Sequence, residues 1–324
     1  IERIEIENLR GIKSGVLEQL SPLSILVGPN GCGKSTVLDA MLISACPDPS
    51  SAPALLVARN PGLMSGPRWL IWRGIKDSQA TVTVGSRFGP RTAVLQVSGG
   101  MLHVQLTGRN SNIANVSTPF VNHGGVVRLN RVNNARAKWI PELRFIDSIT
   151  TAEPIPLYEL YSDAVESGTR EQAIEIIAGS IPGVQRVEIL TEGSTPVVHI
   201  VFPEGSVPAS QCGDGTHSLI RLALEMAARR DGVVLMEEPE VRLHPRAIWQ
   251  SAKVILATVA REIQVILSTH SLELIDALVT QASDVDIDKF SLYRLQLQEG
   301  ELRSSRLAGA DIKFARQKVQ DDLR

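Results

Sequence analysis

The chain has few cysteines and no long apolar segment, and each shortage excludes a class of protein. Three cysteines in 324 residues, at positions 32, 46 and 212, are too few and too scattered for a disulfide framework or a zinc cluster. No uninterrupted apolar run reaches the roughly 18 residues that a membrane-spanning helix needs. The charged, alternating residues 1–7 predict a strand and not a signal peptide. We therefore expect a cytoplasmic protein with reduced thiols and no membrane insertion.

Charge is present but unevenly distributed. The 33 basic and 35 acidic residues give a net charge of −2. Residues 59–144 hold twelve basic and two acidic residues, a charge of +10, so the remainder carries −12. Such asymmetry favours a surface that faces a polyanion such as a nucleic acid, and a solvated β surface is the open alternative. The sharpest basic cluster is Arg128, Arg131, Arg136 and Lys138, and the interleaved aromatic residues are Trp69, Trp72, Phe88 and Trp139.

Hydrophobic residues make up 43% of the chain and charged residues 21%, the composition of a folded globular protein. Short apolar runs indicate buried strands, and a period of two from about residue 80 indicates antiparallel strands. The expected strands span 1–7, 23–27, 81–84, 93–97, 102–106, 126–129, 184–191, 197–202, 233–236, 265–267, 290–297 and 301–307, and the expected helices span 35–44, 157–166, 170–178, 216–230, 248–260 and 272–280.

A glycine-rich loop follows the expected buried strand 23–27. Glycines there let backbone N–H groups surround phosphates, and the N-terminus of the following helix adds positive potential. The ammonium of Lys34 is expected to neutralise the β- and γ-phosphates, and the hydroxyl of Ser35 to bind Mg²⁺. The sequence therefore predicts an ATP site. Its residues, which fit the pattern G-x-x-x-x-G-K-[ST] in full, are Gly28, Pro29, Asn30, Gly31, Cys32, Gly33, Lys34 and Ser35, followed by Thr36.

Two carboxylates follow the apolar run 233–236. A strand buried on both faces delivers such residues at its carboxyl end, where ligands bind in α/β sheets. We expect Glu237 to hold Mg²⁺ through water and Glu238 to orient and deprotonate the attacking water. A strand that ends in a solvated acidic turn is the alternative.

A third strand, 265–267, ends in Ser268-Thr269-His270-Ser271. A lone histidine is usually structural, but this one follows a strand that can lie beside the strand of the glycine-rich loop. We therefore expect the imidazole of His270 to contact the γ-phosphate and to take part in catalysis with Lys34 and Glu238.

A second glycine-rich loop opens the expected helix 216–230. Its residues, Gly213, Asp214, Gly215 and Thr216, suit an anion site at a helix N-terminus. One nucleotide needs only one phosphate loop, so this loop makes sense when it caps the nucleotide of another copy in a head-to-tail dimer. A plain capped turn is the alternative.

Taken together, the four motifs resemble the ATP-binding-cassette (ABC) ATPases, and within them the branch of the SMC, RecF and overcoming-lysogenization-defect (OLD) proteins and related AAA-type defence or repair ATPases. The resemblance also includes Asn8-Leu9-Arg10-Gly11-Ile12 and the string from Glu237 to Pro245. Departures are Gly213, where the family signature has Ser, and Asp214, where transporters commonly carry Gly. The resemblance includes neither the coiled-coil arms of SMC proteins nor a TOPRIM domain.

This resemblance implies an α/β fold of the P-loop NTPase, ABC-ATPase type. It implies a mixed, largely parallel core sheet with helices on both faces, an antiparallel β subdomain and a helical insertion. We expect a single ATPase domain whose core comprises residues 1–45 and 213–324. The basic β subdomain is expected at about 59–145, and the helical and hairpin lobe at about 150–212.

The implied activity is Mg²⁺-dependent ATP hydrolysis by a homodimer that forms in the ATP state. Residues 213–216 of one copy would then face the ATP site of the other. DNA and a partner nuclease are the implied partners, in DNA repair or phage defence. Two other readings stay open: the nucleotide-binding subunit of a membrane transporter, and a signalling protein that binds ATP without hydrolysing it. The β-rich insert and the 213–216 loop disfavour the first, and Glu238 disfavours the second.

Overall fold

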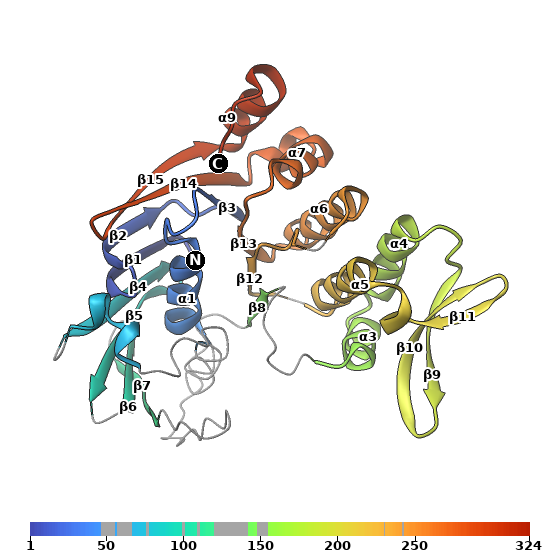
Figure 1. Cartoon of the computed structure of the whole chain (residues 1–324), viewed down its shortest axis with the longest axis horizontal. Helices are drawn as coiled ribbons and strands as arrows, with labels where there is room; N and C mark the ends of the chain where they lie inside the picture. Colours follow the sequence, from blue (N-terminus) through green and yellow to red (C-terminus); the bar gives the residue numbers. More distant parts are fainter. Residues whose placement is uncertain are drawn as a thin grey trace.

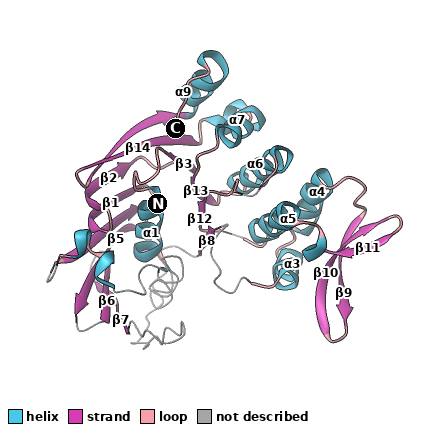
Figure 2. Ribbon diagram, viewed as in Figure 1, coloured by secondary structure: helices cyan, strands magenta, loops and turns pink. Residues whose placement is uncertain are grey.

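The computed structural model describes residues 1–46, 56, 67–75, 78–98, 101–108, 111–119, 142–147, 155–229, 231–241 and 243–324, with the backbone alone described at 111–119. Within them, twelve strands form one mixed sheet (Figures 1 and 2). These are β1 (Arg3–Leu9), β2 (Ile12–Glu18), β3 (Leu23–Val27), β4 (Gln79–Ser86), β5 (Gly89–Ser98), β6 (Met101–Gly108), β7 (Ser111–Pro119), β8 (Leu143–Asp147), β12 (Val233–Glu237), β13 (Gln264–Ser268), β14 (Phe290–Gln298) and β15 (Glu301–Ala308). Their order is β7-β6-β5-β4-β1-β2-β15-β14-β3-β13-β12-β8.

The parallel part of the sheet is formed by β14, β3, β13, β12 and β8. Strand β3 pairs in parallel with both β13 and β14, and β12 pairs in parallel with both β13 and β8. All five residues of β3 are buried, as are the first four of β12. A strand that is covered on both faces has such a mainly apolar sequence, and the one polar residue of β3, Ser24, is hydrogen-bonded to Ser291. The expected strands at 23–27, 233–236 and 265–267 are therefore confirmed.

Helices cover both faces of the parallel strands, as expected (Figure 1). They are α1 (Lys34–Ala45), α5 (Asp214–Ala227), α6 (Pro245–Ala260) and α7 (Leu272–Gln281). Successive strand residues face opposite sides. Leu26 and Leu235 pack in the same apolar cluster as Leu38 of α1. Their neighbours in the strands, such as Val27, pack instead with the cluster that includes Leu274 of α7.

The antiparallel strands β4 to β7 extend the same sheet. Burial alternates along β4, where Ala80, Val82 and Val84 are buried, which is the period of two read from the sequence. Strand β4 pairs antiparallel with β1, so these strands do not form a separate sheet. The expected strand at 126–129 lies outside the described residues.

Residues 143–147 differ from the expected boundary of the β subdomain at about 145. They form β8, which pairs in parallel with β12, because residues Leu143–Asp147 run in register beside Val233–Glu237. The five-residue segment has no alternation or apolar run that would reveal this pairing in the sequence.

The helical lobe consists of α3 (Leu157–Glu166), α4 (Arg170–Ser180) and a three-stranded sheet of β9 (Arg186–Glu192), β10 (Thr195–Phe202) and β11 (Gly205–Pro208), with the short 3₁₀ turn η4 (Ala209–Gln211). It lies next to α5, away from the antiparallel strands (Figure 1). The Tyr161 hydroxyl of α3 donates to the backbone oxygen of Val187 in β9 at 3.0 Å. The expected helical and hairpin insertion is therefore present.

Short elements complete the described chain: η2 (Pro67–Leu70), η3 (Trp72–Gly74), α8 (Asp284–Ile287), α9 (Gly309–Phe314) and the π-helical turn η5 (Ala315–Val319). The aspartates at 284 and 286 pair with Lys313 and Lys289. Among the described residues, no helix is both long enough and apolar enough to cross a membrane, and no cluster of three or more His, Cys, Asp or Glu is arranged to hold a metal ion alone.

Candidate nucleotide-binding site

The predicted phosphate loop lies between β3 and α1. Its backbone requires glycine, because Gly28, Gly31 and Gly33 have φ angles of 141°, 77° and 99°. A Cβ atom at Gly28 would also lie 2.4 Å from the backbone oxygen of Leu295. No side chain caps the N-terminus of α1. Its first N–H groups therefore point out of the helix without an intrahelical acceptor, which suits an anion.

The side chain of Lys34 is turned back into the loop. It is only 6% exposed, and its Nζ donates to the backbone oxygens of Gly28 at 2.8 Å and Pro29 at 3.3 Å. The Sγ atom of Cys32 lies 3.8 Å from the same ammonium. A buried ammonium needs acceptors. Phosphate oxygens would supply stronger, charge-assisted hydrogen bonds than these carbonyls.

The acidic pair lies at the carboxyl end of β12. Glu237 is the last strand residue and is in register with Ser268 of β13. Glu238 has a φ angle of 44°, which is unusual for a residue with a side chain, and its N–H donates to the backbone oxygen of Ser268 at 3.0 Å. The neighbouring strand therefore holds a strained turn exactly where the carboxylate leaves the sheet, as is common at functional sites.

His270 lies next to this pair, and its strand β13 lies beside β3, the strand of the phosphate loop, as the sequence predicted. Its Nε2 atom lies 3.3 Å from Oε1 of Glu238, and both side chains are about one-third exposed. The two groups are thus within hydrogen-bonding reach of each other and of solvent. A carboxylate and an imidazole in this arrangement can share a proton and orient a water molecule.

The donors expected to hold Mg²⁺ share one face of the sheet. Alternation along β12 places Glu237 on the same face as Leu235, which packs in the α1 cluster. Ser35 is the second residue of α1. The Ser268 hydroxyl beside Glu237 is buried and has no hydrogen-bond partner among the described residues. A buried, unsatisfied hydroxyl beside a carboxylate supplies oxygen donors of the kind that a hydrated magnesium ion takes.

The second glycine-rich loop opens α5. Gly213 precedes the helix with a φ angle of 83°, and both Gly213 and Asp214 are exposed. One turn further, burial lowers the pKa of His217, and the charge of Arg221 lowers it further. The positive potential that could attract an anion at this end of α5 therefore comes from the helix N-terminus and not from a charged His217.

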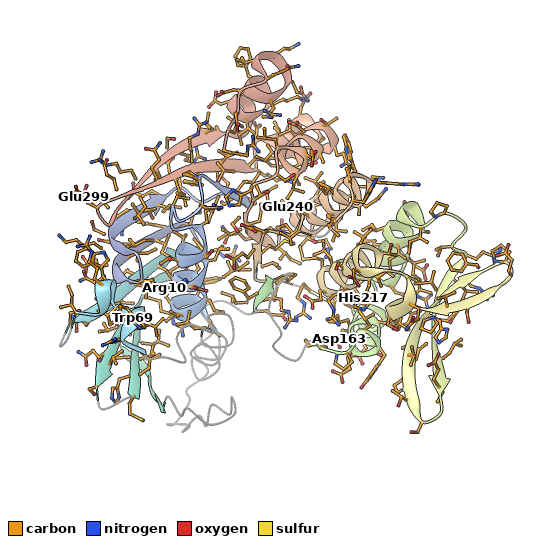
Figure 3. All side chains as sticks on the ribbon, viewed as in Figure 1. Arg10, Trp69, Asp163, His217, Glu240 and Glu299 are labelled. Atoms are coloured by element: carbon orange, nitrogen blue, oxygen red, sulfur yellow. The ribbon has the colours of Figure 1, made fainter. Side chains whose placement is uncertain are left out.

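The other end of α5 is firmly held. Glu225 is 4% exposed and accepts from Arg144 of β8 at 3.0 Å and from Arg221 at 3.3 Å. The guanidinium of Arg261, just after α6, donates to the last carbonyls of α5 and the residues that follow, with distances of 2.6 Å to Met226 and 3.2 Å to Ala227. Figure 3 shows His217 at the exposed end of this anchored helix.

The predicted nucleic-acid residues Arg128, Arg131, Arg136 and Lys138 lie outside the described residues. The described part of the basic segment carries cations stacked on aromatic rings. Arg68 lies 4.6 Å from the ring centre of Trp69, and Arg73 lies 4.5 Å from that of Trp72. Such pairs keep a flat, positively charged surface exposed.

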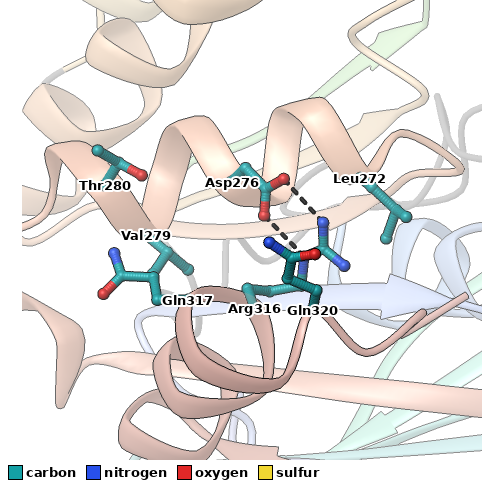
Figure 4. Close-up of a pocket in the computed structure, with 7 residues that line it drawn as sticks. All are labelled: Leu272, Asp276, Val279, Thr280, Arg316, Gln317 and Gln320. Carbon is teal, nitrogen blue, oxygen red and sulfur yellow. Dashed lines mark hydrogen bonds and ion pairs between the residues drawn. The ribbon is translucent and has the colours of Figure 1, made fainter.

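A pocket of about 460 Å³ lies elsewhere, between α7 and η5 (Figure 4). Arg316 of η5 makes a two-pronged ion pair across it with Asp276 of α7, at 2.7 and 2.8 Å. The pair compensates both charges. None of the predicted site residues lines this pocket.

Sequence reasoning gave no role to two polar residues that the structure places beside the acidic pair. Ser268 has been described above, and Glu240 accepts a hydrogen bond from the hydroxyl of Thr269 at 2.6 Å. The signal available for Glu240 was its place in the Glu-Glu-Pro-Glu string, and Ser268 gave no signal beyond its place before Thr269.

Comparison with known proteins agrees with this geometry. A family model described as "AAA ATPase domain" matches residues 1–48, and one described as "AAA domain, putative AbiEii toxin, Type IV TA system" matches residues 202–276. The uncharacterised protein MJECL11 of Methanocaldococcus jannaschii is 32% identical over 114 residues, which cover 98% of that protein and 35% of this chain. Two segments of the chain, residues 1–48 and 202–276, thus match models of AAA-type ATPase domains.

Two further relatives of the chain differ in coverage. The uncharacterised protein MJECL10 of the same organism is 23% identical over 221 residues, which cover 95% of that protein and 62% of this chain. The DNA double-strand break repair Rad50 ATPase of Methanopyrus kandleri is 49% identical over 47 residues. That match covers 14% of this chain and only 5% of the Rad50 protein.

Solved structures show that the chain has the fold of an SMC head. The SMC head bound to the C-winged helix domain of ScpA superposes with a TM-score of 0.56 at 15% identity, over 95% of this chain and 97% of the other. An SMC head with an extended coiled coil, bound to the C-terminal domain of ScpA derived from Pyrococcus furiosus, gives 0.53 at 12% identity and 99% coverage of both. The expected fold class is confirmed, while the OLD branch and the lack of a TOPRIM domain stay predictions.

Proposed function

We propose that this chain binds and hydrolyses ATP, and that two copies close around two ATP molecules. The observation that carries the proposal is the meeting of three motifs at one edge of the sheet. The phosphate loop follows β3, the acidic pair ends β12, and His270 follows β13, which lies between them. This edge is where α/β folds bind ligands.

The reaction would use each group in a separate role. Lys34 leaves the loop carbonyls and contacts the phosphates, whose charge the N-terminus of α1 also stabilises. Glu238 accepts a hydrogen bond from the attacking water and draws its proton, and His270 orients this carboxylate and reaches toward the γ-phosphate. A Mg²⁺ ion held by Ser35 and, through water, by Glu237 would neutralise charge on the β- and γ-phosphates.

The test of this function is the variant Glu238→Gln. The amide keeps the size of the carboxylate but cannot take a proton, so we expect hydrolysis to fall by about 10²–10⁴-fold, the usual contribution of a general base. ATP affinity should stay near that of the wild type, and a dimer should accumulate with ATP, as light scattering would show. The exposed Glu273→Gln, on α7, is the matched control. Full turnover by Glu238→Gln would contradict the assigned base.

DNA is the proposed ligand of the basic segment, and control of a partner nuclease the proposed consequence of dimer closure. Support comes from the charge of residues 59–144, from the stacked pairs at Trp69 and Trp72, and from the Rad50 relative, whose name states a role in DNA repair. The alternative function, the nucleotide-binding subunit of a membrane transporter, is not favoured, because none of these observations supports it.

The nucleic-acid proposal is tested by salt. Phosphate contacts release counterions, so DNA affinity should fall steeply between 50 and 200 mM salt, by about 10³-fold for six contacts. Replacing Arg128 and Arg131 together by Gln should weaken binding and reduce that salt slope by about two contacts. Absence of any gel shift at low salt with ATP present would remove DNA from the proposal.

A further inference from the structure

A third carboxylate, Glu240, lies two residues beyond Glu238 and makes contacts of a different kind. Figure 3 shows Glu240 near the middle of the molecule, on the segment that leads from β12 into α6. Its Oε1 atom accepts from the Thr269 hydroxyl at 2.6 Å and from the backbone N–H of His270 at 3.0 Å. One oxygen therefore joins the segment that follows β12 to the segment that follows β13.

The contact extends into a chain of hydrogen bonds that fixes residues 269–271. The Thr269 side chain is fully buried, and its Oγ1 also accepts from the N–H of Ser271 at 2.9 Å. The Ser271 hydroxyl in turn accepts from the N–H of Leu274 at 3.1 Å and caps α7. His270 lies in the middle of this chain. Its backbone is held by Glu240 on one side and by the start of a helix on the other.

The same chain sets the distance between His270 and the acidic pair. Glu240 belongs to the turn that begins with Glu238, because the N–H of Val241 donates to the backbone oxygen of Glu238 at 3.0 Å. The turn thus carries Glu238 at one position and the acceptor for His270 at another. Two hydrogen bonds, one within this turn and one from the His270 N–H to Glu240, thus link the backbones of Glu238 and His270. The 3.3 Å contact between the His270 ring and the Glu238 carboxylate completes a small ring of interactions.

The second carboxylate oxygen of Glu240 differs from the first. Oε2 is buried and has no hydrogen-bond partner among the described residues. A buried carboxylate oxygen without a donor costs free energy. Such an unsatisfied group is typical of a functional site.

We propose that Glu240 is a positioning residue for ATP hydrolysis, which holds His270 against Glu238 without touching the nucleotide. This inference rests on the proposed ATPase function. It predicts that the effect of Glu240 on turnover passes entirely through His270, and that an acceptor oxygen, more than a negative charge, is what position 240 must supply.

The experiment compares single and double variants of the full chain in steady-state ATP hydrolysis. Glu240→Ala should lower kcat by about 10–100-fold, since small displacements of a catalytic group have effects of this size. The KM for ATP should change by less than about threefold, because Glu240 has no contact with the phosphate loop. Glu240→Gln keeps one acceptor oxygen in place and should restore kcat to within about threefold of the wild type.

A double-mutant cycle separates positioning from simple bracing of the fold. The variant Glu240→Ala/His270→Ala should have the same kcat as His270→Ala alone, because the first change has nothing left to displace. Effects that multiply would overturn the proposal, and so would a His270→Ala variant with full activity. A Glu240→Gln variant as slow as Glu240→Ala would also overturn it, since charge would then be the requirement.

Two controls keep this test separate from the proposed function. Thr269→Ser keeps the hydroxyl and should be nearly as active as the wild type, while Thr269→Val should lower kcat less than Glu240→Ala, because the bond to the His270 N–H remains. Thermal unfolding identifies any variant that fails to fold. If Glu240→Ala does not fold, the kcat of Glu240→Gln tests the proposal instead. A wild-type chain that hydrolyses no ATP refutes the proposed function together with this inference, whereas an active chain with multiplying effects refutes only the role of Glu240.

Discussion

The two glycine-rich loops differ in how completely their own chain surrounds them. The phosphate loop lies at the edge of buried parallel strands, and its Lys34 is almost inaccessible and already hydrogen-bonded. The loop at 213–216 lies at the tip of α5, with Gly213 and Asp214 exposed and Gly215 and Thr216 half-buried. The first loop is therefore built to bind a nucleotide within one chain. The second loop offers an anion site for which this chain's own phosphate loop supplies no ligand.

The helix that carries the second loop, α5, is firmly anchored at its other end. Arg144 and Arg221 fix Glu225, and Arg261 binds the carbonyls at the far end of α5. The helix therefore presents the exposed loop on a rigid support. A rigid, open loop suits contact with another surface better than closure onto its own chain, which is why a partner copy is the proposed occupant.

The largest expected effect is on the buried loop. Lys34→Ala removes the ammonium that would contact the phosphates, and we expect ATP affinity to fall by about 30-fold or more, the factor that corresponds to losing about 2 kcal/mol from a hydrogen-bonded charge pair. Isothermal titration calorimetry measures it. Lys289→Ala, which breaks a surface pair with Asp286, is the control. Equal ATP affinities for Lys34→Ala and the wild type would contradict the assignment of the phosphate loop as the ATP site.

The exposed loop is tested by mixing two inactive variants. Thr216→Glu adds a carboxylate in the first turn of α5, where it suits the helix dipole but repels a partner's triphosphate. Alone it should hydrolyse almost no ATP, and so should Lys34→Ala. Equal mixtures form mixed dimers that hold one intact site each, so about a quarter of wild-type activity should return.

The control for this mixture is Thr195→Glu, an exposed threonine of β10 in the helical lobe, which should be fully active by itself. If the mixture is no more active than the sum of its components, the loop does not act on a partner's nucleotide. The contrast between the two loops would then reduce to a difference in exposure alone.

The smallest expected effect is a pH dependence at the start of α5. Burial holds the pKa of His217 below its usual value of 6.5, so just below that pH the unfolded chain binds a proton that the folded chain does not. Stability should therefore fall as pH drops through this window. Urea unfolding at pH 5 to 7.5 should show a shallower dependence of stability on pH for His217→Gln than for the wild type. Equal slopes for His217→Gln and the wild type would contradict the assignment.

Much of the candidate site could be read from the sequence because its pieces are local. The phosphate loop needs glycines at fixed spacing, and Lys34 and Ser35 follow them directly. The mainly apolar runs at 23–27 and 233–236 are clear signals, since a strand covered on both faces is mostly apolar. His270 required one more step, namely that its strand would lie beside the other two.

Other features depend on pairings between segments far apart in the chain. Residues 143–147 carry no strand pattern of their own, and they extend the parallel sheet only because β12 accepts them at its open edge. The antiparallel strands were expected as a subdomain, yet the pairing of β4 with β1 makes them part of the main sheet. Register of this kind is set by the packing of whole faces and not by any short segment.

The sequence by itself determined where the residues that we propose for phosphate binding, metal binding and proton transfer occur along the chain, because each is encoded within a few residues of a strand end. Only the tertiary structure decided that Glu240 meets Thr269 and His270, and that the Ser268 hydroxyl lies unsatisfied beside Glu237. These contacts join residues about thirty positions apart. Their geometry follows from the parallel register of β12 and β13, a property of the folded sheet that no local pattern contains.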